Sequence, residues 1–192
     1  MKKKIITRSI VIVIIVLFGY YLDKECGVKT VKMQEKAQLG LTGIYLTVLD
    51  YKEIEPLKDD PKLDYDKYIA FEVMLEGSKR GVIENFGHSV SSNPDQYDLC
   101  GLFFLDGEKD GKKQFQGMLD EDYIIKLFGP EFPAIGIGKM GDDKIAHGYV
   151  VFGIPERFKP YKFVYKFYTK AELYQIIFPD TEIHVILEDP VS

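Results

Sequence analysis

An apolar segment close to the N-terminus constrains this chain more than any other feature. The run from Ile10 to Leu22 contains no charged side chain, and three lysines at positions 2–4 lie ahead of it. Counted from Ile10, the run has about 13 residues, which is the length of the apolar part of a signal peptide. Counted from Ile5, it has about 18 residues and can span a membrane if the side chain of Arg8 extends to the lipid head groups. The segment therefore predicts export or membrane insertion, and length alone leaves the choice open.

The residues that follow the run favour an uncleaved anchor. Cleavage of a signal peptide needs small side chains just before the cut, and residues 19–25 contain no triplet of that kind. Tyr20 and Tyr21 stand where interfacial aromatic residues lie, and the lysines keep the N-terminal end in the cytoplasm. We therefore predict a cytoplasmic basic leader and transmembrane signal anchor at residues 1–22, in a single-pass protein of the cell membrane whose C-terminal domain is extracellular. Secretion after signal cleavage is the alternative.

The charge balance argues against nucleic acid as a partner. The chain has 25 Lys and Arg residues against 30 Asp and Glu residues. Four of the basic residues precede the apolar run, so the remainder carries 21 basic against 30 acidic residues, a net charge of −9. Binding to phosphates requires a basic surface. The hydrophobic content of 46% and the aromatic content of 14% predict a packed core rather than disorder.

The two cysteines carry little information. Cys26 follows Lys24 and Glu25, whereas lipid modification of a cysteine needs small or apolar residues there, so we do not predict a lipoprotein. Cys26 and Cys100 could form one disulfide in an oxidising compartment, but their separation in sequence does not establish the geometry. Neither cysteine has the spacing of a zinc site.

Hydrophobic and polar residues alternate over the rest of the chain with the period of half-buried β-strands. The alternation is clearest from Ile44 to Leu49 and from Ile69 to Glu76, with a proline-containing loop at 55–61 between them. Similar patterns indicate strands at residues 99–105, 112–118, 145–154, 162–168 and 182–187. The charged segment before them leads us to expect a tether at residues 23–38 and one domain at residues 39–192.

About seven short strands separated by turns predict an all-β fold, an antiparallel β-sandwich. The capping-box spacing of Thr169 and Glu172 predicts one short helix from Lys170 to Ile177 near the C-terminus. The connection at residues 119–141 has no pattern that assigns its structure.

The order of several motifs adds a resemblance. Four features follow one another between Leu39 and Asp189: Thr47–Asp50, the long strand at 68–76, the Leu102–Lys113 hairpin, and the strand at 148–155 followed by 161–166. Together they resemble a family of secreted or membrane-anchored immunoglobulin-like domains of unknown function from Gram-positive bacteria. The resemblance implies an immunoglobulin-like sandwich at the cell surface and transfers no catalytic residue. The chain departs from the family at Gly77–Gly81, where the family has an Asn-led turn.

Two acidic clusters have the composition of a cation site. Asp106, Glu108 and Asp110, followed by Gly111, imitate the start of a calcium loop, but the twelfth position is Gly117, which cannot supply the required carboxylate. We interpret these residues as the tip of a hairpin, where Asp and Gly supply the backbone angles of the turn. A second group of acids, in and just after the long connection, could hold a cation if the connection folds back, but we interpret it as solvated loop surface: Asp120, Glu121, Asp122, Asp142 and Asp143.

The histidines do not mark a catalytic or metal site. His88, His147 and His184 have no partner at ligand spacing, and no nucleophile motif accompanies them. We therefore predict no catalytic, cofactor-binding or metal-binding residue and no cofactor. An aromatic series is interpreted mainly as core, because its members alternate along a strand: Phe158, Tyr161, Phe163, Tyr165, Phe167 and Tyr168.

Two classes of function remain. The first is a non-catalytic, membrane-anchored surface module that binds a protein, glycan or wall component of the cell envelope. The alternative is an envelope enzyme, a hydrolase, whose site is built from scattered loop residues. A deep cleft in which Asp120, Asp142 and His147 converge would favour the hydrolase, whereas the same groups scattered in solvent would favour the binding module.

Overall fold

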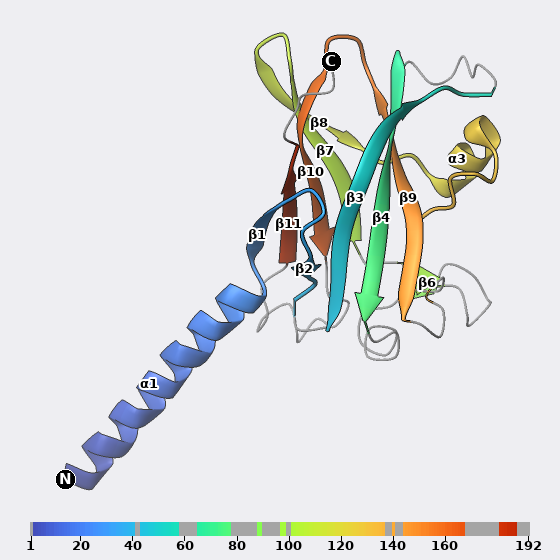
Figure 1. The fold of residues 1–192 in the computed structure, drawn as a ribbon. Helices are drawn as coiled ribbons and strands as arrows, with labels where there is room; N and C mark the ends of the chain where they lie inside the picture. The colour runs from blue at the N-terminus through green and yellow to red at the C-terminus, as the bar shows by residue number, and fades with distance from the viewer. Residues whose placement is uncertain are drawn as a thin grey trace.

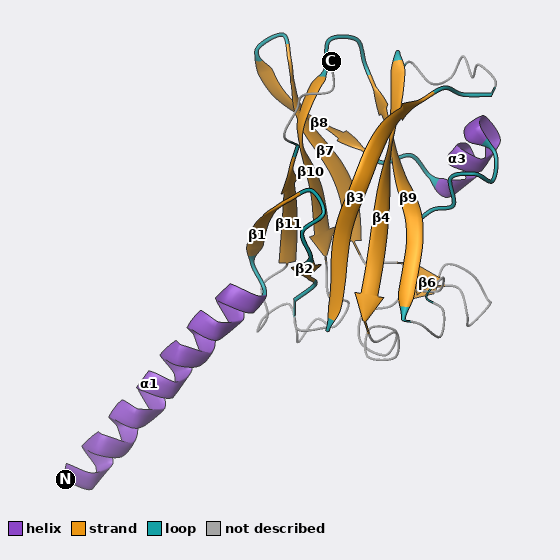
Figure 2. Cartoon of the chain, in the orientation of Figure 1, coloured by secondary structure: helices purple, strands orange, loops and turns teal. Residues whose placement is uncertain are grey.

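The computed structural model describes residues 2–40, 43–57, 65–77, 88–89, 97–98, 101–136, 140, 144–167 and 181–187, and for residues 2–8, 23, 25, 88–89, 97–98 and 101 it describes the backbone alone. Figures 1 and 2 show the arrangement of the helices and strands. In chain order these are α1 (Lys2–Glu25), β1 (Val28–Lys32), β2 (Ala37–Gln38), β3 (Ile44–Ile54), β4 (Lys67–Gly77), β5 (His88–Ser89), β6 (Tyr97–Asp98), β7 (Gly101–Lys109), β8 (Lys112–Gly117), α3 (Glu121–Phe128), β9 (Ile145–Ile154), β10 (Lys159–Phe167) and β11 (Thr181–Ile186).

Two sheets form a sandwich (Figure 1). One sheet has the strand order β1-β11-β10-β7-β8, and the other has the order β2-β3-β4-β9. Neighbouring strands are antiparallel except β1 and β11, which are parallel. The short strands β5 and β6 pair with each other. The prediction of a mostly β, sandwich-like fold is therefore confirmed.

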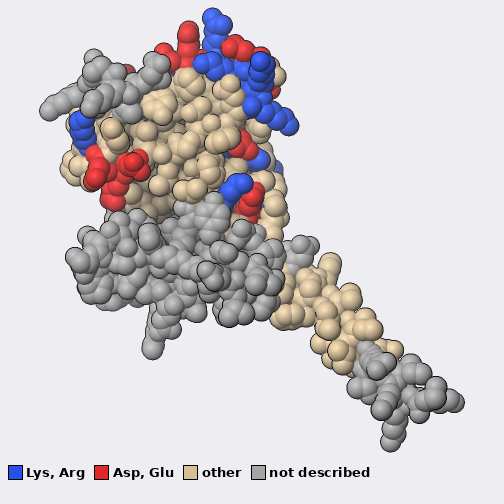
Figure 3. Space-filling model, turned by 180° about the vertical axis from the view of Figure 1, so that it is seen from behind, with Lys and Arg blue, Asp and Glu red and all other residues tan. Residues whose placement is uncertain are grey.

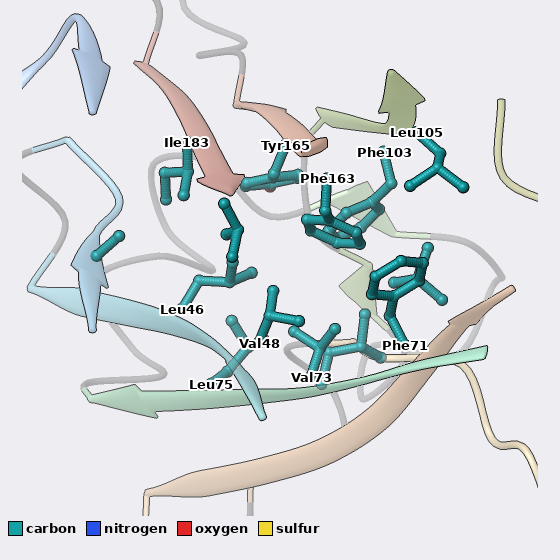
Figure 4. Close-up of a cluster of buried hydrophobic side chains, with 14 of the residues drawn as sticks. Leu46, Val48, Phe71, Val73, Leu75, Phe103, Leu105, Phe163, Tyr165 and Ile183 are labelled. Carbon is teal, nitrogen blue, oxygen red and sulfur yellow. The ribbon is translucent and has the colours of Figure 1, made fainter. Parts of the chain in front are cut away.

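The core lies between the two sheets (Figure 4), because alternate residues of each strand point inward. Phe71 of β4 faces Phe163 of β10 across the interior, with ring centroids 5.0 Å apart. Phe103 stacks on Tyr165 at 4.4 Å. Much of the predicted aromatic core is confirmed, since Phe158, Phe163, Tyr165 and Phe167 are all buried. Tyr161 is instead 37% exposed, and Tyr168 lies outside the described residues.

A second hydrophobic cluster lies on the outer side of the four-stranded sheet. Leu119 leaves β8 and donates its N–H to the carbonyl of Val151 in β9, at 2.8 Å. Helix α3 follows, in the connection whose structure the sequence did not assign. It buries Ile124, Leu127 and Phe128 in a cluster with Val151 and other sheet residues. The helix ends at Gly129, whose positive φ of 78° suits a residue without a side chain.

Helix α1 projects away from the sandwich (Figure 1). Its nine side chains from Ile10 to Phe18 are all between 49% and 63% exposed. At the other end of the helix, Leu22 and Cys26 are buried at 5% and 3% exposure. Among the residues whose side chains are described, a search for a helix long and apolar enough to cross a membrane finds none.

The prediction of a tether at residues 23–38 requires correction. Residues 28–32 form β1, which runs beside β11 with Val28 opposite Glu182, and residues 37–38 form β2, which pairs with β3. The segment looked like a tether because an edge strand has little of its surface in the core and tolerates lysines. Val31 nevertheless packs against the main core and Ala37 is buried. The ordered domain therefore begins about ten residues earlier than the sequence suggested.

The strand predictions agree with the structure except at their ends. Strand β9 covers the predicted residues 145–154, whereas β7 extends four residues beyond the predicted end at Leu105. The helix predicted from Lys170 to Ile177 and most of the loop at 55–61 lie outside the described residues. Cys100 also lies there, so the question whether it pairs with Cys26 stays open.

Candidate functional site

The outer face of the five-stranded sheet presents a group of polar and aromatic side chains. Phe163, Tyr165 and Phe167 of β10 point into the core, so the residues between them point outward. Of these, Val164 lies opposite Phe104 of β7 on one side and His184 of β11 on the other. The pairing of three strands therefore places their outward side chains in rows across the sheet.

Two ion pairs flank Val164. The Nζ atom of Lys162 lies 2.9 Å from Oδ2 of Asp106, and the Nζ atom of Lys166 lies 3.0 Å from Oε1 of Glu182. Each pair joins residues directly opposite each other on neighbouring strands. The long side chains cover Val164, which is 2% exposed although it belongs to the outer face.

His184 completes the second ion pair. Its Nε2 atom lies 2.9 Å from Oε2 of Glu182, so both carboxylate oxygens of Glu182 are engaged. Burial by itself would raise the pKa of the Glu182 carboxyl. The hydrogen bonds from His184 and Lys166, with their charges, outweigh this and lower the pKa below its ordinary value. The carboxyl therefore remains ionised near neutral pH.

Aromatic rings form the other side of the site. Phe104 and Phe115 meet edge to face, with ring centroids 5.6 Å apart, and Phe115 is 67% exposed. Lys166 extends over Phe104, with its Nζ atom 5.9 Å from the ring centroid. Gly117 lies opposite Phe104 on β8, and a side chain there would meet no atom within 4 Å. The absence of a side chain at Gly117 leaves the space beside Phe104 open.

These residues enclose a surface groove of about 210 Å³. The lining residues are Phe104, Asp106, Phe115, Lys162, Val164, Lys166, Glu182 and His184. Figure 3 views the molecule from behind and shows a broad uncharged area below a charged upper end, with small groups in which acidic and basic side chains lie side by side. We call this site, defined by its eight lining residues, the sheet groove.

A smaller hollow lies on the other sheet. It has a volume of about 60 Å³ and is lined by residues of β3, β4 and β9. Lys52 lies there, with its Nζ atom 5.2 Å from the ring centroid of Phe132. A space of this volume holds only a few water molecules, so the sheet groove is the stronger candidate.

The residues weighed as a calcium loop form a hairpin instead. Asp110 and Gly111 connect β7 and β8 with φ angles of 51° and 74°, the left-handed values of a two-residue turn of the I′ type. Asp106 points into the sheet groove and pairs with Lys162. In the part of the chain that the structure describes, no three His, Cys, Asp or Glu side chains form a group that could hold a metal ion. The interpretation as a hairpin tip is therefore confirmed for Asp110 and Gly111, whereas Asp106 and Glu108 lie within β7.

The structure describes two of the three residues whose convergence in a cleft would favour a hydrolase. Asp120 is exposed just before α3, and His147 is exposed on β9, with Nδ1 3.7 Å from Oε1 of Glu72. Asp142 lies outside the described residues. His88 belongs to β5 rather than to a loop. The described residues therefore do not reveal the cleft expected of a hydrolase.

The sequence reasoning missed the partnership of Glu182 and His184. No histidine has a carboxylate at the spacing typical of a metal site or an acid–base pair. On a β-strand, however, residues two apart share a face, and Glu182 and His184 lie within a predicted strand. The lysines at 162 and 166 are likewise on one face of a predicted strand, so the period of the strand was the available signal.

Neither the models of protein families, nor the curated proteins, nor the solved structures compared with the chain give a significant match.

Proposed function

We propose that this protein is a membrane-anchored, non-catalytic binding module, whose immunoglobulin-like domain lies outside the cytoplasm and binds a component of the cell envelope through the sheet groove. The observation that carries the proposal is the exposure of the apolar side chains of α1. A helix that displays these side chains to water is unfavourable, since each buried aliphatic side chain gains roughly 1.5–3 kcal/mol. The lipid bilayer is the partner that best covers such a helix.

The length of the apolar run supports the anchor. From Ile5 to Leu22 the run covers about 27 Å at the rise of an α-helix, close to the thickness of the hydrocarbon layer of a bilayer, roughly 30 Å. Lys2, Lys3 and Lys4 precede the run, and positive charge is typical of the cytoplasmic side. The sandwich then lies on the opposite side of the membrane.

The strand order supports the immunoglobulin-like assignment. In such folds the first, second and fifth strands share one sheet, and the third, sixth and seventh share the other. Strands β3, β4 and β9 are neighbours in one sheet, and β7, β10 and β11 are neighbours in the other. The placement of the chain among surface domains of Gram-positive bacteria rests on the resemblance of its motifs alone.

The chemistry of the sheet groove supports binding rather than catalysis. A general acid or base works best when its pKa lies near the working pH. Glu182 is held ionised by His184 and Lys166, and Asp106 is paired with Lys162. Groups that are paired in this way are suited to hold a ligand in place. The alternative, an envelope hydrolase with a site built from scattered loop residues, has no comparable support.

The test of the anchor uses the full chain with a reporter fused after Ser192. The reporter is active only outside the cytoplasm, and membranes are separated from soluble protein by centrifugation. We expect reporter activity in the membrane fraction. Replacement of Ile14 and Val16 by Lys places two charges in the apolar run and should release the protein from membranes or block export.

The control places the same charges on the sandwich. Tyr45 and Leu57 are exposed, and their replacement by Lys should leave membrane association unchanged. A reporter that is inactive in the wild-type chain would refute the proposed location. An active reporter in the culture medium instead of the membrane would show secretion after signal cleavage.

A further inference from the structure

We propose that the sheet groove binds a neutral sugar residue of an envelope glycan. The inference rests on the proposed binding function and specifies the class of ligand. Three properties of the groove support it: the pairing of its charges, the hydrogen-bonding groups that remain available, and its two aromatic rings, of which Phe115 is exposed.

The charges in the groove compensate one another. Its two lysines, Lys162 and Lys166, are paired with its two carboxylates, Asp106 and Glu182, at 2.9 and 3.0 Å. The charges of these four side chains sum to zero. A charged ligand would meet no net charge of opposite sign in the groove and would gain little electrostatic attraction there. The groove therefore favours a ligand without net charge.

Polar groups remain that can bind hydroxyls. Asp106 pairs with Lys162 through Oδ2, and His184 bonds Glu182 through Nε2. Among the described residues, the other polar atom of each side chain, Oδ1 of Asp106 and Nδ1 of His184, makes no hydrogen bond. The ammonium group of Lys162 carries three donors, of which Asp106 takes one. A sugar hydroxyl both donates and accepts a hydrogen bond. Neighbouring hydroxyls on a sugar ring can thus bridge a carboxylate and an ammonium group without separating them.

The aromatic side of the groove suits the apolar face of a sugar ring. Phe115 is 67% exposed and meets Phe104 edge to face, so the two rings form a corner rather than a flat surface. The C–H groups on one side of a pyranose ring pack against such ring faces, while its hydroxyls point outward. The volume of about 210 Å³ fits one such ring. The open space at Gly117 lets the rest of a chain leave the groove across β8.

The test measures sugar binding by the full-length protein in phosphocholine micelles, which carry no sugar. The probes are an array of neutral gluco-, galacto-, manno- and N-acetylglucosamine oligosaccharides, with oligogalacturonate as an anionic comparison. The affinity for the best neutral probe is then measured by calorimetry. Phe115→Ala removes the exposed ring, and Gly117→Ile fills the open space without backbone strain, because Gly117 lacks a positive φ.

We expect a neutral oligosaccharide to bind, and each variant to weaken that binding by roughly tenfold or more. The control Tyr45→Ala removes an exposed ring from the other sheet and should leave the affinity unchanged. Absence of binding to every neutral probe, preference for oligogalacturonate, or an unchanged affinity in both groove variants would overturn the sugar assignment.

Co-sedimentation of the full-length protein, kept in phosphocholine micelles, with detergent-extracted cell envelopes separates this inference from the proposed function, because extraction removes the membranes that α1 would enter by itself. If Gly117→Ile abolishes co-sedimentation but no neutral sugar binds, the groove binds another envelope component and the sugar assignment alone is wrong. If the wild-type protein binds neither envelopes nor sugars, the proposed binding function fails as well.

Discussion

The Nε2 atom of His184 lies 2.9 Å from Oε2 of Glu182, two residues earlier on β11. The other oxygen of the same carboxylate lies 3.0 Å from Nζ of Lys166, which is directly opposite on β10. One carboxylate thus joins two strands on the outer face of the sheet. This arrangement has a consequence for the pH dependence of stability.

We expect Glu182→Gln to lower the free energy of unfolding by about 0.5–1 kcal/mol at pH 7. The pKa of Glu182 is lowered in the folded state, so its stabilisation is present above the ordinary value of 4.5 and is lost as the pH falls through the lowered value. The difference between wild type and variant should therefore vanish in acid. Chemical unfolding between pH 3 and pH 8 measures it. Glu53→Gln is the control, since the pair of Glu53 with Lys67 is about half exposed; an equal loss there would contradict the special role of Glu182.

Gly148 should tolerate no side chain. A Cβ atom there would overlap the backbone of Ile135, which runs beside β9, and a backbone cannot move aside as a side chain can. We expect Gly148→Ala to lower the free energy of unfolding by about 1–3 kcal/mol. Gly117→Ala is the matched control, because nothing lies within 4 Å of the added atom. Backbone entropy alone would make Gly→Ala stabilising, so comparable losses in the two variants, measured by thermal unfolding, would contradict the steric explanation for Gly148.

Removal of β1 and β2 should destabilise the sandwich. A soluble fragment that begins at Asp23 keeps both strands, whereas one that begins at Leu39 lacks them and exposes the edge of β11. The shorter fragment also loses the core contact of Val31. We expect it to be less stable by roughly 2 kcal/mol or more and to aggregate. Light scattering and urea unfolding compare the two fragments. Equal stability would show that the segment is a tether after all.

Thr47→Val should stabilise the protein. The side chain of Thr47 is buried at 3% residue exposure, and its Oγ1 atom has no hydrogen-bond partner among the described residues. Replacement of an unpartnered buried hydroxyl by a methyl group removes its desolvation cost, about 1 kcal/mol. Thr30→Val is the control, because Thr30 is exposed on β1 and should show little change. A destabilised Thr47→Val protein would indicate that the hydroxyl has a partner in solution.

The fold class could be predicted from the sequence because it depends on a local pattern. The alternation of apolar and polar residues from Ile69 to Glu76 predicts a half-buried strand, whichever strands lie beside it. Strand β4 confirms this prediction. Strand β1 was missed because its pattern is weak: an edge strand with three exposed positions carries lysines as readily as a loop does. Helix α3 was missed because it is only eight residues long. Its stability comes from packing on the sheet rather than from its own sequence.

The candidate site was much harder to predict. Asp106, Lys162 and Glu182 are far apart in sequence, and only the register of β7, β10 and β11 brings them together. A shift of one residue in either pairing would turn one set of side chains to the opposite face. The sequence showed that alternate residues of each strand share a face. It did not show which strands are neighbours, and the groove depends on that order.

The joint between α1 and the sandwich has a final consequence. Leu22 and Cys26 are buried, and the carbonyl of Gly27 accepts a hydrogen bond from the N–H of Glu182 at 3.1 Å. No slack stretch of chain separates the helix from the sheet. If the helix is embedded in lipid as proposed, it holds the domain through a rigid connection rather than a flexible linker. The domain then stays close to the membrane surface. Its ligand must therefore lie, or diffuse, close to the bilayer.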